Sequence, residues 1–208
     1  MVEVRIESGA RGLTALLSRA LALDAQASAR LQEVGEGQLD VFVTTPFDAI
    51  ASRRTSGSTT HPGVTVSARS MLDALKSGAA EVGPARDGFW PGSLPPGEGF
   101  VEREVVPVGV ATQLANEGRN LARQFSGPAG PPKSLLDNTV LTADADSDAP
   151  VEIPMRMIFA CTALGLIPGF EAPAEIPRHL RVSTAGSWVR LDAPFGSVYR
   201  STRPNLLF

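Results

Sequence analysis

The spacing of apolar and polar residues divides the first half of the chain into short strands and helices. Residues 2–6 alternate between apolar and charged side chains, which predicts a half-buried strand. Residues 12–34 carry apolar side chains three or four positions apart, and glycines follow, which predicts one helix over the whole stretch. Further along, the pattern predicts strands at 39–44 and 64–66, a short helix from Pro46 to Arg54, and a helix at 71–76 that Ser67 or Ser70 caps and Gly78 ends.

The second half is predicted to contain helices and a small antiparallel sheet. A strand is predicted at 100–106 and a helix at 110–125, and residues 155–167 are apolar nearly all round, which is typical of a buried helix. Two strands are predicted on either side of the acidic loop 143–150, and the chain closes with a three-stranded meander. These five strands are expected at residues 139–142, 151–153, 180–184, 188–192 and 198–201.

Together these patterns predict an α+β protein. An N-terminal half of alternating strands and helices would pack on a C-terminal half of helices and a small antiparallel sheet. Proline and glycine recur so closely between the two halves that neither a helix nor a central strand can persist there. We therefore expect an N-terminal half at residues 1–84, a Pro/Gly-rich linker at 85–99 and a C-terminal half at 100–208.

Composition narrows the class of protein. The chain has 208 residues, of which 43% are hydrophobic and 20% charged, as in soluble globular proteins. Its net charge of −3 argues against a surface built entirely for nucleic acid or anionic lipid. The amino terminus does not resemble a signal peptide, and the longest apolar stretch, 157–170, contains Pro168 and is too short to span a bilayer. We expect a cytoplasmic protein with no membrane span.

The sequence contains no complete motif for binding a metal ion or a cofactor. Gly127 to Ser134 resembles a phosphate-binding loop, but Pro132 stands where its second glycine belongs, and prolines lack the N–H groups that hold phosphates. Asp144, Asp146 and Asp148 alternate like calcium ligands, yet the glycine and glutamate that an EF-hand requires are missing. The chain has two histidines and one cysteine, Cys161, for which we expect a buried, inert thiol. We expect no metal and no cofactor.

A hydroxyl-rich segment after the predicted short helix is a candidate anion site. Arg53, Arg54, Ser58 and His61 could donate hydrogen bonds to a phosphate or a carboxylate. The same His61, oriented by Asp40 or Asp48, could serve a small hydrolase, although the chain has no G-x-S-x-G elbow and we assign no catalytic residue. An exposed loop with neither role is the alternative.

Two further surfaces are candidates for binding. Residues 178–208 contain five arginines and one acidic residue, and a basic, aromatic sheet face is typical of several nucleic-acid-binding modules. An ordinary sheet with arginine as its usual cation is the alternative. Phe89 and Trp90 could contact a partner or pin their own segment to the protein. The nucleic-acid candidates are Arg178, Arg181, Trp188, Arg190 and Arg200.

Three segments resemble an uncharacterised actinobacterial protein family of unknown function. They are Pro46 to Arg54, Arg86 to Pro96 and Gly186 to Tyr199. None of them is a mechanistic motif, so the resemblance implies no activity, ligand or site residue. It implies a bacterial, cytosolic origin, in keeping with the excess of arginine over lysine, 17 to 2.

The leading hypothesis is a non-enzymatic cytosolic binding or interaction protein that associates with itself or with another protein. It depends on the lack of a complete catalytic set in the sequence. One alternative is a nucleic-acid-binding module that uses the basic C-terminal sheet. The other is the small hydrolase centred on His61.

Overall fold

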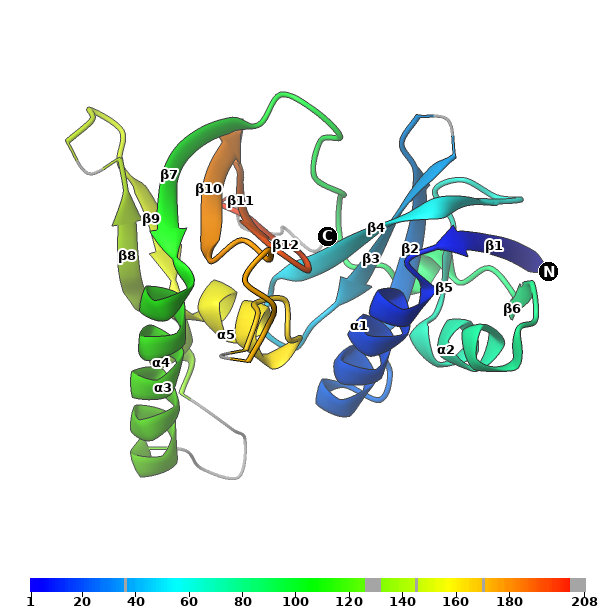
Figure 1. Ribbon diagram of the computed structural model, residues 1–208, viewed down its shortest axis with the longest axis horizontal. Helices are drawn as coiled ribbons and strands as arrows, with labels where there is room; N and C mark the ends of the chain where they lie inside the picture. The colour runs from blue at the N-terminus through cyan, green and yellow to red at the C-terminus, as the bar shows by residue number, and fades with distance from the viewer. Residues whose placement is uncertain (36, 126–131, 145, 170, 203–208) are drawn as a thin grey trace. The chain divides into compact units, whose positions relative to one another are not determined.

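Antiparallel strand pairing organises both structural units of this chain. The computed structural model describes residues 1–35, 37–125, 132–144, 146–169 and 171–202 (Figure 1). The first unit comprises Met1–Pro46 and Ile50–Gly97, and the second comprises Phe47–Ala49 and Glu98–Phe208. The division into an N-terminal half at 1–84, a linker at 85–99 and a C-terminal half at 100–208 stays a prediction.

The first unit is a sheet with two helices. Its elements are β1 (Val2–Ser8), α1 (Ala10–Leu23), β2 (Ser28–Glu33), β3 (Gln38–Thr44), β4 (Ile50–Thr59), β5 (Thr65–Ser67), α2 (Ala68–Ser77), β6 (Glu81–Gly83) and the 3₁₀ turn η1 (Asp87–Phe89). The strands lie in the order β5-β2-β3-β4, β1 pairs with β4, and β6 pairs with β1. Figure 1 shows α1 and α2 next to each other on one side of these strands, and the two helices contact each other.

The apolar stripe of α1 explains how this unit forms its core. Leu13, Leu16 and Leu17 fall on one face of the helix and are fully buried, together with Leu31 and Val41 of the sheet. Helix α2 begins and ends as the sequence predicts, because Ser67 caps its first turn and Gly78 ends it with a φ of 73°.

The predicted helix over 12–34 is wrong beyond residue 23. Asp24 ends α1, because its side chain accepts a hydrogen bond from the Gln26 N–H at 2.9 Å and its carbonyl accepts one from the Ala27 N–H. The chain then enters β2, a strand that pairs with β3 on one side and with β5 on the other. Pairing with the adjacent hairpin strand β3 and with the more distant β5 therefore overrides the helical spacing of Leu31.

The predicted short helix from Pro46 to Arg54 is also wrong. Asp48 has a φ of 52°, in the left-handed region, and the chain reverses direction there. Thr44 then lies opposite Ile50, and β4 continues as a ten-residue strand against β3. Arg53 and Arg54 are consequently strand residues.

The second unit combines a four-stranded sheet, a two-stranded ribbon and three helices among its described residues. Its elements are β7 (Val101–Pro107), α3 (Val108–Phe125), α4 (Lys133–Asp137), β8 (Thr139–Ala143), β9 (Val151–Pro154), α5 (Met155–Ala163), β10 (His179–Ala185), β11 (Trp188–Ala193) and β12 (Gly196–Ser201). The sheet has the order β12-β11-β10-β7, and β8 pairs with β9 alone. The segment from Gly127 to Pro132, including the pattern that resembles a phosphate-binding loop, lies outside the described residues except for Pro132.

The core of the second unit lies where α5 packs on the sheet. Met157, Ile158 and Cys161 of α5 are buried, as are Val182 and Leu191 of the sheet. Helix α3 approaches α5 closely at Gly118, where a Cβ would lie 2.8 Å from the Met155 sulfur. The predicted strands of the ribbon and of the closing meander are confirmed, and so is the burial of Cys161.

The predicted fold class is wrong. Every strand pairing within each unit is antiparallel, so the first unit is not an alternating α/β layer. The meander of the second unit is not a small separate sheet either, because β7 pairs with β10 from Pro107 to Val101 and extends it. Among the described helices, none combines the length and hydrophobicity that a bilayer-spanning segment needs.

Replacing Gly57 by alanine should destabilise the first unit. A Cβ at this position would lie 2.3 Å from the backbone oxygen of Arg5 in β1, so the paired strands would have to separate. We expect a loss of about 1–3 kcal/mol in the free energy of unfolding, measured by urea titration. Gly88→Ala is the matched control, because a Cβ there meets nothing within 4 Å. Equal stability of the two variants would contradict the close approach of β1 to Gly57.

The Cys161 thiol should be unreactive in the folded protein. Burial raises its pKa to about 12, and its side chain is 0% exposed, so neither thiolate nor access is present at neutral pH. We expect Ellman's reagent to label the thiol only after denaturation. Stoichiometric labelling of the native protein within seconds would show that α5 is not packed as described.

Candidate functional site

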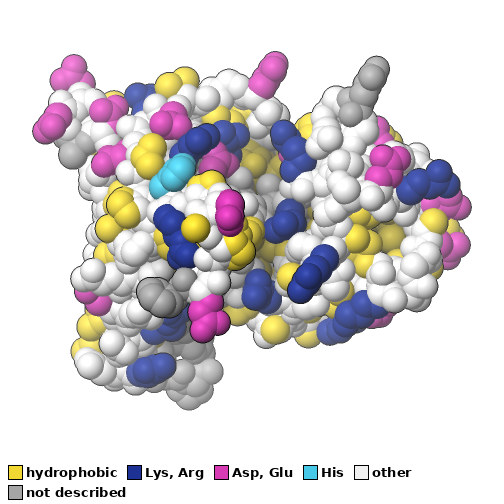
Figure 2. Space-filling view, in the orientation of Figure 1, with side chains coloured by type: hydrophobic (Ala, Val, Ile, Leu, Met, Phe, Trp, Pro, Cys, Tyr) yellow, Lys and Arg dark blue, Asp and Glu magenta, His cyan; other side chains and the backbone are white. Residues whose placement is uncertain are grey.

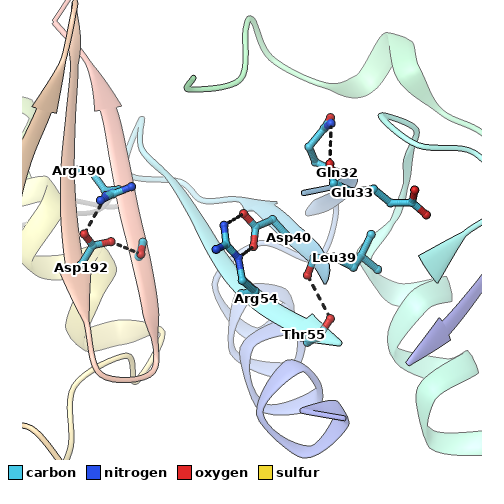
Figure 3. Close-up of polar contacts among 9 residues, drawn as sticks. Gln32, Glu33, Leu39, Asp40, Arg54, Thr55, Arg190 and Asp192 are labelled. Carbon is cyan, nitrogen blue, oxygen red and sulfur yellow. Dashed lines mark hydrogen bonds and ion pairs between the residues drawn. The ribbon is translucent and has the colours of Figure 1, made fainter. Parts of the chain in front are cut away.

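The four candidate residues for anion binding do not converge. Arg53 and Arg54 are adjacent in β4, so their side chains point to opposite faces of the sheet. Arg54 donates two hydrogen bonds of 2.7 Å to the buried carboxylate of Asp40 (Figure 3). On the other face, Arg53 lies against α1, since a Cβ on Gly12 would be 2.2 Å from the Arg53 guanidinium carbon. Partial burial lowers the pKa of Arg53.

The remaining two residues of this candidate site lie in exposed positions. Ser58 is exposed on β4 opposite Arg5, and His61 follows the strand in a turn. The Nδ1 of His61 is 2.8 Å from the Thr60 hydroxyl, and within the described chain no carboxylate contacts the imidazole. Asp40 is bound by Arg54, and Asp48 lies beside Arg156. The described residues therefore do not assemble the hydrolase arrangement expected around His61.

The predicted basic face of the C-terminal sheet is divided. Trp188, Arg190 and Arg181 share one face of the sheet. Trp188, Arg190 and Asp192 alternate along β11, and Arg181 lies directly opposite Asp192. Arg200 lies opposite Val189 and therefore belongs to the other face, whose strand residues are mostly buried. Arg203 lies outside the described residues.

Three of these arginines are engaged within the protein. Arg178 donates to the carbonyl oxygens of Gly169 and Ala172 at 3.0 and 2.9 Å, and Arg181 lies 3.6 Å from a Glu102 oxygen. Arg190 is 2.8 Å from Asp192, as Figure 3 shows, and its guanidinium stacks 4.1 Å from the centre of the Phe100 ring. Such a surface offers few unpaired donors to nucleic-acid phosphates.

Phe89 and Trp90 have different environments. Trp90 is 7% exposed and lies beside the Arg30 guanidinium, whereas Phe89 is 65% exposed and carries Arg86 on its ring. Their segment is fixed to β5, because the Thr65 N–H donates to Asp87 at 2.7 Å and the Arg86 N–H donates to the Thr65 carbonyl. Trp90 therefore pins the segment, and of the two rings only Phe89 is free for a partner.

The helices of the first unit carry a positive charge that the sequence patterns did not reveal. Arg11 and Arg19 on α1, and Arg69 and Lys76 on α2, are exposed, while Asp73 is the one acidic residue of the two helices. Their net charge is thus +3, whereas the rest of the unit has five basic and eight acidic residues. Figure 2 shows Lys and Arg side chains on the face where α1 lies.

The helix termini strengthen this positive surface. Neither α1 nor α2 has an acidic residue in its first turn, so the partial positive charge of each amino terminus stays uncompensated. The half-buried Arg53 adds a further cation beneath Gly12 of α1. We call the exposed side of α1 and α2, with Arg11, Arg19, Arg69 and Lys76, the basic helical face.

A groove of about 680 Å³ lies within the second unit, between the β8–β9 ribbon and the ends of β10, β11 and β12. Its lining includes Arg103, Asp137, Glu152, Trp188 and Arg200. In the described part of the chain, His, Cys, Asp and Glu nowhere gather in a group of three that could hold a metal ion. Asp144 of the acidic loop instead lies 3.5 Å from Arg103.

Arg156 is a buried cation beside this groove. Its side chain is 4% exposed and donates to the Phe47 carbonyl at 2.8 Å and to the carboxylate of Asp137, with Asp48 at 3.5 Å. The hydrogen bond from Arg156 holds the pKa of the Asp137 carboxyl below its ordinary value. Asp137 is therefore occupied by Arg156 although it lines the groove.

Comparison with known proteins places the chain among families without an assigned function. The family model described as Domain of unknown function (DUF8185) matches residues 95–205, and Domain of unknown function (DUF8010) matches residues 3–92. No curated protein matches the sequence.

Solved structures of bacterial sliding clamps have a similar fold. A DNA polymerase sliding clamp from Caulobacter crescentus aligns with 97% of this chain at a TM-score of 0.58 and 12% identity. A sliding clamp from Bartonella birtlesii bound to griselimycin aligns with 100% at 0.57 and 12%, and a Helicobacter pylori clamp bound to a DNA ligase peptide with 97% at 0.53 and 11%. The alignments span 65%, 67% and 66% of those chains. The described chain thus has a sliding-clamp-like fold.

Removing the carboxylate of Asp137 should weaken the fold in a pH-dependent way. The lowered pKa of Asp137 means that its contribution to stability is present above about pH 4 and is lost as the pH falls through the folded-state value. We expect Asp137→Asn to cost about 1–2 kcal/mol at pH 7, because Arg156 keeps its other partners and Asp137 is partly exposed.

Urea unfolding at several pH values would measure this effect. The difference between the wild type and Asp137→Asn should shrink under acidic conditions. Asp148→Asn, on an exposed residue of the ribbon loop, is the matched control and should cost little at any pH. A difference that stays constant from pH 7 to pH 3 would show that the Arg156 contact does not stabilise the charged carboxylate.

Proposed function

We propose that this chain, which belongs to the family Domain of unknown function (DUF8185), is a non-enzymatic binding protein that associates with duplex nucleic acid through its basic helical face. The single observation that carries the proposal is the separation of charge in the first unit. Helices α1 and α2 have a net charge of +3 in a chain whose overall charge is −3.

Positive charge concentrated on the helices attracts the phosphates of nucleic acid. Phosphates of duplex DNA lie close together along the helix axis, so a row of exposed arginine and lysine side chains displaces several counterions at once. Arg11, Arg69 and Lys76 are exposed, and only Asp73 opposes them on these helices. The rest of the unit has five basic and eight acidic residues, so the positive charge that attracts phosphates lies on the helices.

The proposal rests on the charge of the helices and not on structural likeness. The similar structures are those of DNA polymerase sliding clamps. At 11–13% identity, this similarity shows the fold and not the function. The finer parts of our hypothesis stay predictions: a cytoplasmic location, an actinobacterial origin, self-association and binding of a protein partner. The divided sheet of the second unit favours the helices over Arg178, Arg181, Trp188, Arg190 and Arg200 as the nucleic-acid surface.

Charge reversal on the helices should remove nucleic-acid binding. We expect the double variant Arg11→Glu, Arg69→Glu to bind a fluorescent 20-base-pair duplex at least about tenfold more weakly in roughly 50 mM salt. Fluorescence anisotropy over a series of salt concentrations measures both the affinity and its salt dependence, whose slope should fall in the variant.

A charge-matched control separates this surface from a general effect of net charge. The double variant Arg5→Glu, Arg181→Glu makes the same change of charge on exposed residues of strands β1 and β10, and it should bind like the wild type. Absence of binding by the wild type at low salt would overturn the proposal. So would equal weakening in both double variants.

A further inference from the structure

The groove of the second unit is bounded by elements that differ in chemistry. One wall is the β8–β9 ribbon, with Val151, Glu152 and Pro154, and the other is formed by the ends of the sheet strands, with Trp188 and Arg200. Figure 1 labels the ribbon and these three strands. A volume of about 680 Å³ is in the range of sites that hold ligands. The groove is separate from the basic helical face, which belongs to the first unit.

Arg200 is the cation of this groove that the rest of the protein leaves unsatisfied. Its Nε is buried and finds no hydrogen-bond acceptor in the described chain, and its guanidinium forms no ion pair there. The nearby carboxylate of Asp137, which Arg200 influences electrostatically, already accepts from the buried Arg156. Arg103, the other cation of the lining, donates to Thr184 at 2.9 Å and pairs with Asp144.

Glu152 is the complementary anion. It is exposed, lines the same groove, and has no ion pair among the residues that the structure describes. Its neighbours in β9 are apolar, and prolines at 150 and 154 flank that strand within the lining. The groove therefore presents one arginine and one carboxylate without an ion pair in the described chain, and Pro150, Val151 and Pro154 add apolar residues to its lining.

Because the groove is lined by both basic and acidic residues, it favours some classes of ligand over others. A nucleic acid would bring phosphates towards the Glu152 carboxylate, which has no ion pair in the described chain and repels them. A wholly apolar ligand would desolvate Arg200 and leave it without an acceptor, which is costly. A polypeptide can carry opposite charges at chosen positions and also offers backbone groups to the lining hydroxyls of Thr139 and Ser187.

We infer that this groove binds an extended polypeptide segment that sets an acidic side chain against Arg200 and a basic side chain against Glu152. Charge complementarity identifies the occupant. The acidic side chain pairs with the guanidinium of Arg200, which lines the groove and has no ion pair among the described residues, and the basic side chain pairs with Glu152. This site is independent of the basic helical face, so either can be tested without the other.

The probe is an array of acetylated octapeptides of alanine and proline that carry one aspartate and one lysine at every spacing and in both orders. The full-length protein is applied, and the affinity of the best peptide is then measured by fluorescence anisotropy. We expect Arg200→Glu and Glu152→Lys each to weaken binding about tenfold or more. Glu152 is exposed, so Glu152→Lys should fold normally even if Arg200→Glu does not.

Exchange of charges gives the decisive comparison. The double variant Arg200→Glu, Glu152→Lys should prefer the peptide whose aspartate and lysine are exchanged, which neither single variant binds well. Arg181→Glu is the matched control, because this exposed arginine lies outside the groove and should leave the affinity unchanged.

Three results would overturn the inference. The first is that no charged peptide binds better than its all-alanine counterpart. The second is equal weakening by Arg181→Glu and by Glu152→Lys. The third is binding of a single-stranded oligonucleotide that Arg200→Glu abolishes while no peptide binds, which would make the groove a nucleic-acid site.

Discussion

Neighbouring side chains of a strand point to opposite faces of the sheet, and this alternation decides which ionisable groups of the chain can meet. It separates Arg53, which lies under α1, from Arg54, which binds Asp40 on the other face. It also places Arg200 on the face opposite to Trp188. Residues that are close in sequence are thereby assigned to different surfaces, and no candidate site composed of consecutive strand residues survives as one site.

The same alternation explains where the exposed positive charge of the first unit lies. A strand arginine that faces an acidic or aromatic neighbour is paired within the protein, as Arg54 and Arg190 are. Helical side chains such as Arg11 and Arg69 are exposed, and Asp73 on α2 is the one acidic residue of the two helices. Cations that remain available to an external polyanion therefore accumulate on the helices.

Much of the fold could be predicted from local sequence signals, and the failures have a common physical cause. Helix α2, with Ser67 and Gly78 at its ends, and the closing strands follow from caps, turns and period-two alternation. Strands β2 and β4 do not. The turn at Asp24 and the left-handed residue Asp48 redirect the chain into these strands, and each strand also pairs with one that is distant in sequence, β2 with β5 and β4 with β1. The antiparallel topology depends on these two strands, so the predicted fold class is wrong for the same reason.

The candidate sites were harder to predict for a related reason. Whether an arginine is paired depends on strand register, which a periodic pattern in one segment does not specify. Register places Arg181 near Glu102, and the fold brings Arg156 against Asp137, so these cations are neutralised internally. Arg200 differs from these cations, because it has no ion pair in the described chain, and the carboxylate of Asp137, on which it acts electrostatically, accepts its hydrogen bond from Arg156. Since Arg156 already binds the Asp137 carboxylate in the lining, the acidic partner that we propose for Arg200 would have to come from a ligand.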